Sequence, residues 1–140
     1  MPRKDSYHNA VKIGLQKKGW LITDDPFTIT STGMDVQIDL AAVESISAQL
    51  GAERMIAVEI KSLKQPVRLY DFYQALGQYM VYQIALEKYR IEKTLYLAIP
   101  ISAYNKLKEV DLFREAWRKH KVNLLIFNEK TKNILKWINH

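Results

Sequence analysis

A short apolar segment that ends in two charged residues constrains the fold of this 140-residue chain more than any other feature. Met55 to Ile60 reads Met-Ile-Ala-Val-Glu-Ile, and Lys61 follows it. An apolar run of this length is typical of a central strand that is buried on both faces. Burying an unpaired carboxylate is costly, so Glu59 needs a compensating partner. The pattern therefore predicts that a cation or a metal ion lies beside this strand.

A second expected strand, Met34 to Ala41, carries Asp39 twenty positions before Glu59. Successive side chains of a strand point to opposite faces, so Glu59 and Lys61 should share one face. Asp39 should share a face with Gln37 on its own strand. The expected apolar faces are Ile56, Val58 and Ile60 on one strand and Val36, Ile38 and Leu40 on the other. If the two strands pair, both carboxylates and the ammonium group meet on one patch.

Two carboxylates and a lysine on one patch can bind a divalent cation and act on a phosphate. Magnesium takes oxygen ligands, commonly one or two carboxylates together with water and phosphate oxygens. A lysine beside it can position or help to deprotonate an attacking water, or balance the charge on a phosphate. The pattern predicts a phosphodiesterase site with Asp39 and Glu59 as ligands of Mg²⁺ or Mn²⁺ and with Lys61 as a catalytic group. The alternative is a solvated edge strand, because Glu and Lys two positions apart are common there.

Composition narrows the class of protein. The length fits a single domain, 1–140, and no apolar stretch reaches the length of a membrane span. The absence of cysteine excludes a disulfide framework and a thiolate metal site, and fits the cytoplasm. No signal peptide is expected, because the first five residues run directly into an amphipathic segment. The net charge of +6 permits a polyanionic partner such as DNA.

Periodicity and turn signals predict an α/β fold with a mixed central sheet flanked by helices. Val43 to Gly51 fits either a short helix or an edge strand. The first helix should be capped by Asp5 and stopped by Gly19. The expected helices are 5–18, 69–88 and 112–121, and the expected strands are 20–23, 27–32, 34–41, 55–61, 94–99, 122–127 and 134–138.

The long helix offers two further candidates. Gln78 and Tyr82 are four positions apart, so they project from one face of the helix. Together they could hold a DNA phosphate or orient Lys61. The alternative is that Tyr79 and Tyr82 are core aromatics and that Gln78 lies on a solvated flank. The spacing alone favours the alternative.

The chain resembles the fdxN element excision controlling factor family, XisH, and more broadly the PD-(D/E)XK nuclease superfamily. The similarity to XisH runs over essentially the whole chain. The matching blocks are Lys4-Asp5 with His8 and Val11, Gly19-Trp20, Thr23-Asp24-Asp25-Pro26, Ile38-Asp39-Leu40, Ile56-Ala57-Val58-Glu59 with Lys61-Ser62, Ala75-Leu76-Gly77-Gln78 with Tyr82, and Leu95-Tyr96-Leu97-Ala98 with Pro100.

This resemblance implies a restriction-endonuclease-like fold in which Asp39 and Glu59 bind the metal and Lys61 assists hydrolysis. Gln78 and Tyr82 are similar to substrate-binding residues of some nucleases of the superfamily. Two positions depart from the pattern: Ile38 stands where many members have proline, and His8 stands where several active members have a glutamate. The second departure leaves the site one acidic ligand short.

The resemblance also implies a role. XisH proteins are cyanobacterial cytoplasmic proteins needed, with a partner called XisI, for excision of a DNA element during heterocyst development, while a separate recombinase performs the recombination. Two interpretations stay open: a metal-dependent DNA endonuclease, or a weak or silent nuclease-like module that binds DNA and XisI. A homodimer is also open. We further expect His8 to be a capping or packing residue, Asp24 and Asp25 to be turn residues, and Asp35 to be a reserve ligand if its strand extends that far.

Overall fold

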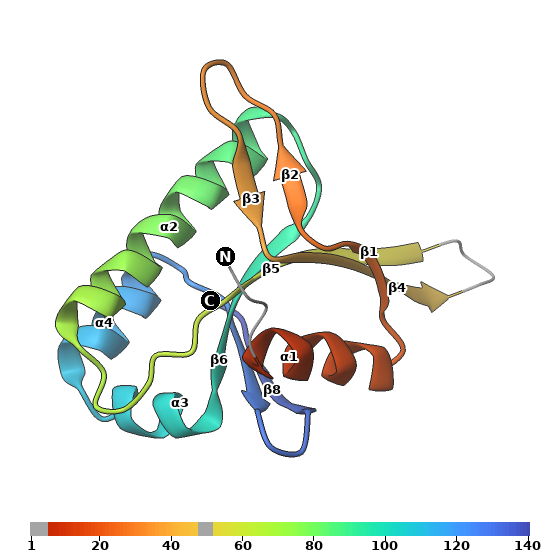
Figure 1. The fold of residues 1–140 in the computed structure, drawn as a ribbon. Coiled ribbons are helices and arrows are strands. Elements are labelled where there is room, and N and C mark those ends of the chain that lie inside the picture. Colours follow the sequence, from red (N-terminus) through yellow and green to blue (C-terminus); the bar gives the residue numbers. More distant parts are fainter. Residues whose placement is uncertain (1–5, 48–51) are drawn as a thin grey trace.

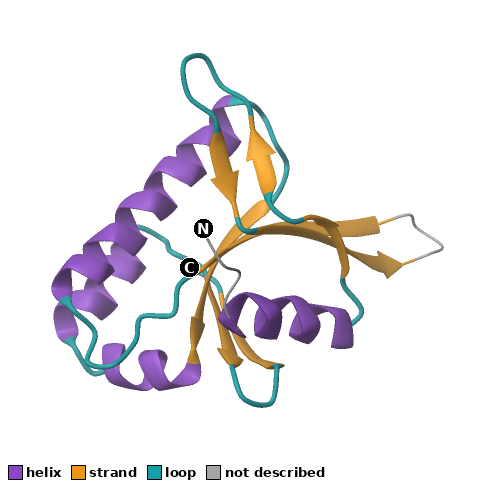
Figure 2. Cartoon of the chain, viewed as in Figure 1, coloured by secondary structure: helices purple, strands orange, loops and turns teal. Residues whose placement is uncertain are grey.

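A computed structural model describes residues 6–47 and 52–140 of the chain (Figures 1 and 2). Helices and strands alternate after an N-terminal helix and a strand-rich segment. In chain order the elements are α1 (Ser6–Lys17), β1 (Leu21–Asp24), β2 (Phe27–Ile29), β3 (Val36–Ile38), β4 (Leu40–Ser47), β5 (Ala52–Ile60), α2 (Leu69–Lys88), β6 (Thr94–Pro100), α3 (Ile101–Leu107), α4 (Asp111–Lys119), β7 (Leu124–Asn128) and β8 (Asn133–Ile138).

Six of the strands form one mixed sheet in the order β1-β4-β5-β6-β7-β8. β5, β6 and β7 are parallel neighbours in its centre, and the other neighbouring pairs are antiparallel. Parallel neighbours need a crossover, which α2 provides between β5 and β6 and which α3 and α4 provide between β6 and β7. β2 and β3 form a separate antiparallel hairpin. The expected mixed α/β sheet flanked by helices is therefore confirmed.

Helices cover the sheet on both faces, with α1 on one side and α2 and α4 on the other (Figure 1). Ala10, Val11 and Leu15 of α1 are fully buried against one face of the sheet. Phe72 of α2 and Trp117 of α4 pack into the core on the other face. Two covered faces explain why the middle of β5, from Met55 to Val58, and most of β6 and β7 are apolar.

The chain bends at Asp39, between β3 and β4, and this bend contradicts one expectation. A single strand over 34–41 was expected, but β3 ends at Ile38 and β4 begins at Leu40. Ile38 packs into the core beneath α2, whereas Leu40 packs into the core beneath α1. The prediction that Val36, Ile38 and Leu40 share one face is therefore wrong. Strict alternation fails because the chain leaves the β2–β3 hairpin and enters the central sheet at Asp39.

Other differences are small. Val43 to Gly51 was expected to be either a short helix or an edge strand, and β4 shows that it is a strand as far as Ser47. Residues 48–51 and the expected cap Asp5 lie outside the described residues. One helix, clearest over 112–121, was expected after Pro100, but the structure has two, α3 and α4. Gly19 does stop the first helix: its φ of +91° lies in the left-handed region that glycine adopts without strain.

The longest helix, α2, is attached to the sheet by Tyr79. Its hydroxyl donates a hydrogen bond to the carbonyl of Leu95 at 3.1 Å and accepts one from the N–H of Asn123 at 3.0 Å. Tyr79 is therefore a core residue, and burial raises the pKa of its phenol. Neither α2 nor any other helix in the described part of the chain combines the length and apolarity needed to cross a membrane.

Candidate functional site

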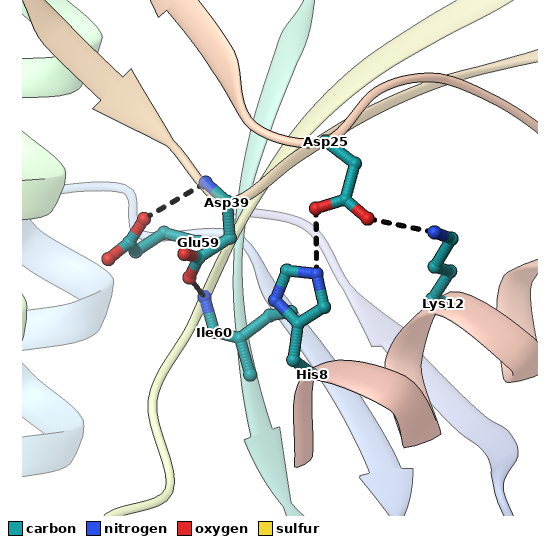
Figure 3. Close-up of polar contacts among 6 residues, drawn as sticks. All are labelled: His8, Lys12, Asp25, Asp39, Glu59 and Ile60. Carbon is teal, nitrogen blue, oxygen red and sulfur yellow. Dashed lines mark hydrogen bonds and ion pairs between the residues drawn. The ribbon is translucent and has the colours of Figure 1, made fainter. Parts of the chain in front are cut away.

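Two carboxylates meet where the pairing of β4 and β5 ends. The antiparallel register opposes Leu40 to Val58, so Asp39 lies beside Glu59. Asp39 Oδ2 accepts a hydrogen bond of 2.8 Å from the N–H of Ile60, and the N–H of Asp39 approaches Glu59 Oε1 at 3.4 Å (Figure 3). The Asp39 side chain thus takes the place of a backbone acceptor at the end of the ladder. Asp39 and Glu59 lie on adjacent segments, as the geometric expectation required.

Lys61 joins the same cluster. Its Nζ lies 3.4 Å from Glu59 Oε2, and its side chain is 24% exposed, so it spans from the buried carboxylate to the surface. The N–H of Lys61 donates to the carbonyl of Ala98 at 2.9 Å, which continues the β5–β6 pairing beyond the end of β5. The backbone therefore stays extended through Lys61. This is why Glu59 and Lys61 project to one side, as their alternation predicted.

The electrostatics of the cluster are unfavourable for two ionised carboxylates. The pKa of Glu59 is raised from its ordinary 4.5 to about 7, first by burial and then by the negative charge of Asp39. Lys61 and the N–H of Asp39 oppose this rise without cancelling it. Glu59 is only 6% exposed. A cation placed between the carboxylates would favour the ionised form, so the site has the electrostatic character of a metal site.

The long helix brings Tyr82 to the carboxylates. The pKa of its phenol is raised to about 12 by burial and by the negative charges of Glu59 and Asp39. These charges act on Tyr82 because β5 carries Glu59 on the face that α2 covers, the face to which Ala57 also belongs. Tyr82 is half-buried, so the alternative that it contributes to the core holds in part. Its hydroxyl is nevertheless close enough for the negative charges of both carboxylates to raise its pKa.

The second candidate on the long helix is Gln78. Its Oε1 is buried and has no hydrogen-bond partner. A buried polar atom without a partner is uncommon and costly, so this atom is a candidate for contact with a bound molecule. The alternative of a solvated flank does not describe Gln78, because its amide oxygen has no access to solvent.

A polar groove of about 470 Å³ opens beside the cluster. Its wall includes Lys61 itself, and its other cations are Lys64 and Arg68. Arg68 is held at the N-terminal end of α2 by an ion pair with Asp71 at 3.1 Å. The complete lining is Lys61, Ser62, Leu63, Lys64, Gln65, Pro66, Arg68, Asp71 and Gln74. The groove therefore has three cationic side chains against one carboxylate, that of Asp71, and this positive balance suits a polyanionic ligand.

A second polar cluster was not foreseen. Asp25 Oδ1 and His8 Nε2 form a hydrogen bond of 2.9 Å, and Lys12 Nζ donates to Asp25 Oδ2 at 2.8 Å (Figure 3). Asp25 was expected to be only a turn residue, but it joins the loop after β1 to α1. One sequence signal could have indicated this contact: His8 and Lys12 are four positions apart and share a helix face. His8 is a buried, hydrogen-bonded packing residue, as expected.

The carboxylates of Asp39 and Glu59 are oxygen ligands of the kind that a hard divalent cation binds. Among the described residues, no group of three or more His, Cys, Asp or Glu could hold a metal ion. Asp35 is exposed and precedes β3, so the condition under which it would be a reserve ligand is not met. Asp39 and Glu59 remain as two adjacent carboxylates. Magnesium is commonly held by one or two carboxylates, with water and phosphate oxygens at its other positions.

Comparisons with known proteins agree with one another. The XisH protein family model matches residues 1–135. An XisH family protein from Nostoc punctiforme PCC 73102 is 36% identical, with a TM-score of 0.85 over 96% of this chain and 100% of that one. An fdxN element excision controlling factor protein from Anabaena variabilis is 36% identical, with a TM-score of 0.84 over 97% of this chain and 100% of that one. A search of curated proteins found no match. The chain belongs to the XisH family.

Proposed function

We propose that this XisH-family chain is a metal-dependent DNA endonuclease of the PD-(D/E)XK superfamily. In this proposal it acts in the cytoplasm of a cyanobacterium as a controlling factor for programmed excision of a DNA element. A solved relative from Anabaena variabilis is named an fdxN element excision controlling factor protein. The observation that carries the enzymatic part is the junction of Asp39, Glu59 and Lys61. There a buried carboxyl has a pKa of about 7 beside a second carboxylate and an ammonium group.

Each residue of the cluster has a distinct task in this proposal. Asp39 and Glu59 would hold Mg²⁺ or Mn²⁺, which when bound polarises a phosphate oxygen and favours ionisation of the attacking water. The N–H of Ile60 fixes the Asp39 carboxylate through its 2.8 Å hydrogen bond, so one ligand is oriented in advance. Lys61 is paired with Glu59 and reaches the surface, so it can donate a hydrogen bond to the water or to a phosphate oxygen.

DNA would follow the groove that starts at Lys61. Lys64 and Arg68 are exposed on its wall, where they can neutralise backbone phosphates. The net charge of +6 adds a long-range attraction. Gln78 and Tyr82 complete the proposed substrate contacts from α2, because the amide N–H of Gln78 and the hydroxyl of Tyr82 are donors that a phosphate oxygen can accept from.

The decisive experiment is cleavage of DNA by the purified protein. Single-stranded, double-stranded, branched and nicked DNA are incubated with Mg²⁺ or Mn²⁺, and we expect cleavage that stops on chelation. Asp39→Ala and Glu59→Ala should abolish cleavage, because each removes a proposed metal ligand. Lys61→Ala should slow turnover while metal binding persists. Asp35→Ala is the matched control, since this exposed carboxylate lies outside the cluster and its loss should change nothing.

A second candidate function rests on the small ligand set. The described residues contribute only two acidic side chains to the site, and His8 is engaged by Asp25. A catalytically weak or silent module that binds DNA and an XisI-like protein would need no third ligand. If every DNA survives both metals, with and without the XisI-like protein, the endonuclease is refuted. Salt-dependent DNA binding in the same samples would then support the binding module.

A further inference from the structure

The outer face of α2 is apolar although it lies in solvent. Between Asp71 and Glu87 the helix contains no charged residue over fifteen consecutive positions. Large apolar side chains are exposed along this stretch and just before it. The exposed fractions are 51% for Leu69, 68% for Tyr70, 59% for Tyr73, 40% for Met80, 54% for Val81 and 60% for Ile84. A contiguous apolar stripe of this kind marks a surface that another molecule covers.

Gly77 lies in the middle of the stripe, where the fold itself does not require a glycine. A Cβ placed on Gly77 would meet no atom within 4 Å, and the residue is helical rather than left-handed. Glycine weakens the interior of a helix relative to alanine. No packing within the chain offsets that loss. Close packing of a second helix backbone against Gly77 would offset the loss of helix stability, because only glycine leaves room for such an approach.

The stripe is symmetric about Gly77. Tyr70 and Ile84 lie seven positions before and after it, and Tyr73 and Val81 lie four positions before and after it. In an antiparallel pair of identical helices, positions equally far from the two-fold axis face each other. We propose that α2 is the interface of a homodimer in which two copies cross at Gly77. Tyr70 then faces Ile84 of the second copy, and Tyr73 faces its Val81.

The surroundings of the stripe fit a second copy of this chain. A hollow of about 380 Å³ lies beside Met80 and Ile84, where Tyr70 of the second copy arrives. A 20-residue helix is about 30 Å long. Its six exposed side chains offer roughly 500 Å² per copy, and about 1,000 Å² in total is the lower bound of the area expected for a biological interface.

This inference does not depend on the proposed catalytic function. Gln78 and Tyr82 project from a different side of α2 than Tyr73, Gly77 and Ile84, as the helical periodicity requires. The polar groove beside Lys61 borders the start of α2 and is not part of the stripe. The dimer therefore leaves the carboxylate cluster accessible. A protein that does not cleave DNA would still dimerise through α2.

The first test measures the mass of the full chain by analytical ultracentrifugation over a wide range of concentrations. We expect a concentration-dependent dimer for the natural chain. Gly77→Leu and Ile84→Asp should raise the dissociation constant at least about tenfold, because Gly77 lies at the crossing point and Ile84 packs against Tyr70 of the second copy. Leu135→Asp is the matched control: Leu135 is 49% exposed on β8, away from α2, and its substitution should leave the dimer intact. Circular dichroism confirms that each variant is folded.

The second test uses the absence of cysteine. Tyr73→Cys and Val81→Cys give two chains with one thiol each, at positions that face each other across the proposed two-fold axis. Mild oxidation of a mixture of the two chains should link them, whereas the same mixture made with Leu135→Cys in place of Val81→Cys should remain largely unlinked. A chain that is monomeric at every concentration would overturn the proposal, even if an XisI-like protein then bound to α2. A dimer that withstands both α2 substitutions and does not crosslink between positions 73 and 81 would overturn it as well.

Discussion

The pKa of Glu59 predicts that neutralising one buried carboxyl makes the metal-free protein more stable. Glu59→Gln keeps the size and shape of the side chain and removes its charge. In the natural chain Glu59 is 6% exposed and lies beside Asp39, so its ionised form is poorly solvated and repelled. We therefore expect the free energy of unfolding of Glu59→Gln to exceed that of the natural chain at alkaline pH.

The magnitude follows from the pKa. Folding raises the pKa of Glu59 from 4.5 to about 7, and one pKa unit corresponds to about 1.4 kcal/mol. Ionised Glu59 thus lowers the free energy of unfolding by about 3 kcal/mol. The variant gains about this much, because the pKa of about 7 already includes the favourable ion pair between Glu59 and Lys61. For a chain of this length the gain corresponds to a rise of about 10 °C in Tm.

The pH dependence has a definite sign. Below about pH 4.5 the carboxyl is protonated in both the folded and the unfolded state, and Glu59 contributes nothing to the pH dependence. Between about pH 4.5 and 7 the folded state binds more protons than the unfolded state, so the stability of the natural chain falls as the pH rises. Above about pH 7 the full destabilisation is present. The advantage of Glu59→Gln should therefore grow from pH 5 to pH 8.

Urea unfolding with EDTA present, at several pH values from 5 to 8.5, measures this difference. Glu53→Gln is the control, because Glu53 lies on the same strand and is exposed. Addition of Mg²⁺ or Mn²⁺ should stabilise the natural chain at pH 8 and leave Glu59→Gln nearly unaffected. The reasoning is refuted if Glu59→Gln is no more stable than the natural chain at pH 8, or if its advantage is the same at pH 5.

Two further predictions concern other parts of the molecule. Asp25→Ala should lower the free energy of unfolding by about 2–3 kcal/mol, because it removes the hydrogen bonds that Asp25 makes with the buried His8 and with the amine of Lys12. Urea unfolding measures this, and an effect no larger than that of Asp24→Ala would contradict it. DNA affinity should fall steeply with salt, and Lys64→Ala should reduce the slope of log K against log salt by about 1, because one phosphate contact is lost. Fluorescence anisotropy titrations measure the slope, with Lys119→Ala on α4 as the control. Equal slopes for both variants would exclude the groove as the DNA path.

Local chemistry made part of this structure predictable from the sequence. The apolar run before Glu59 identified a central strand, and alternation along that strand put Glu59 and Lys61 on one side. Gly19 ended the first helix because few other residues adopt its backbone conformation without strain. These properties depend on neighbours in the chain, so the sequence carries them directly.

Long-range pairing decided the rest. The contact between Asp39 and Glu59 depends on the register of β4 and β5 and on a bend that the alternation of Val36, Ile38 and Leu40 did not reveal. The bond between His8 and Asp25 joins residues seventeen positions apart, through the packing of α1 on the sheet.

The pKa of Glu59 was also beyond the sequence, because burial and the approach of Asp39 set it. A sequence states which groups can ionise. Only the folded arrangement fixes how much solvent and which charges surround them, since both depend on segments that meet in space.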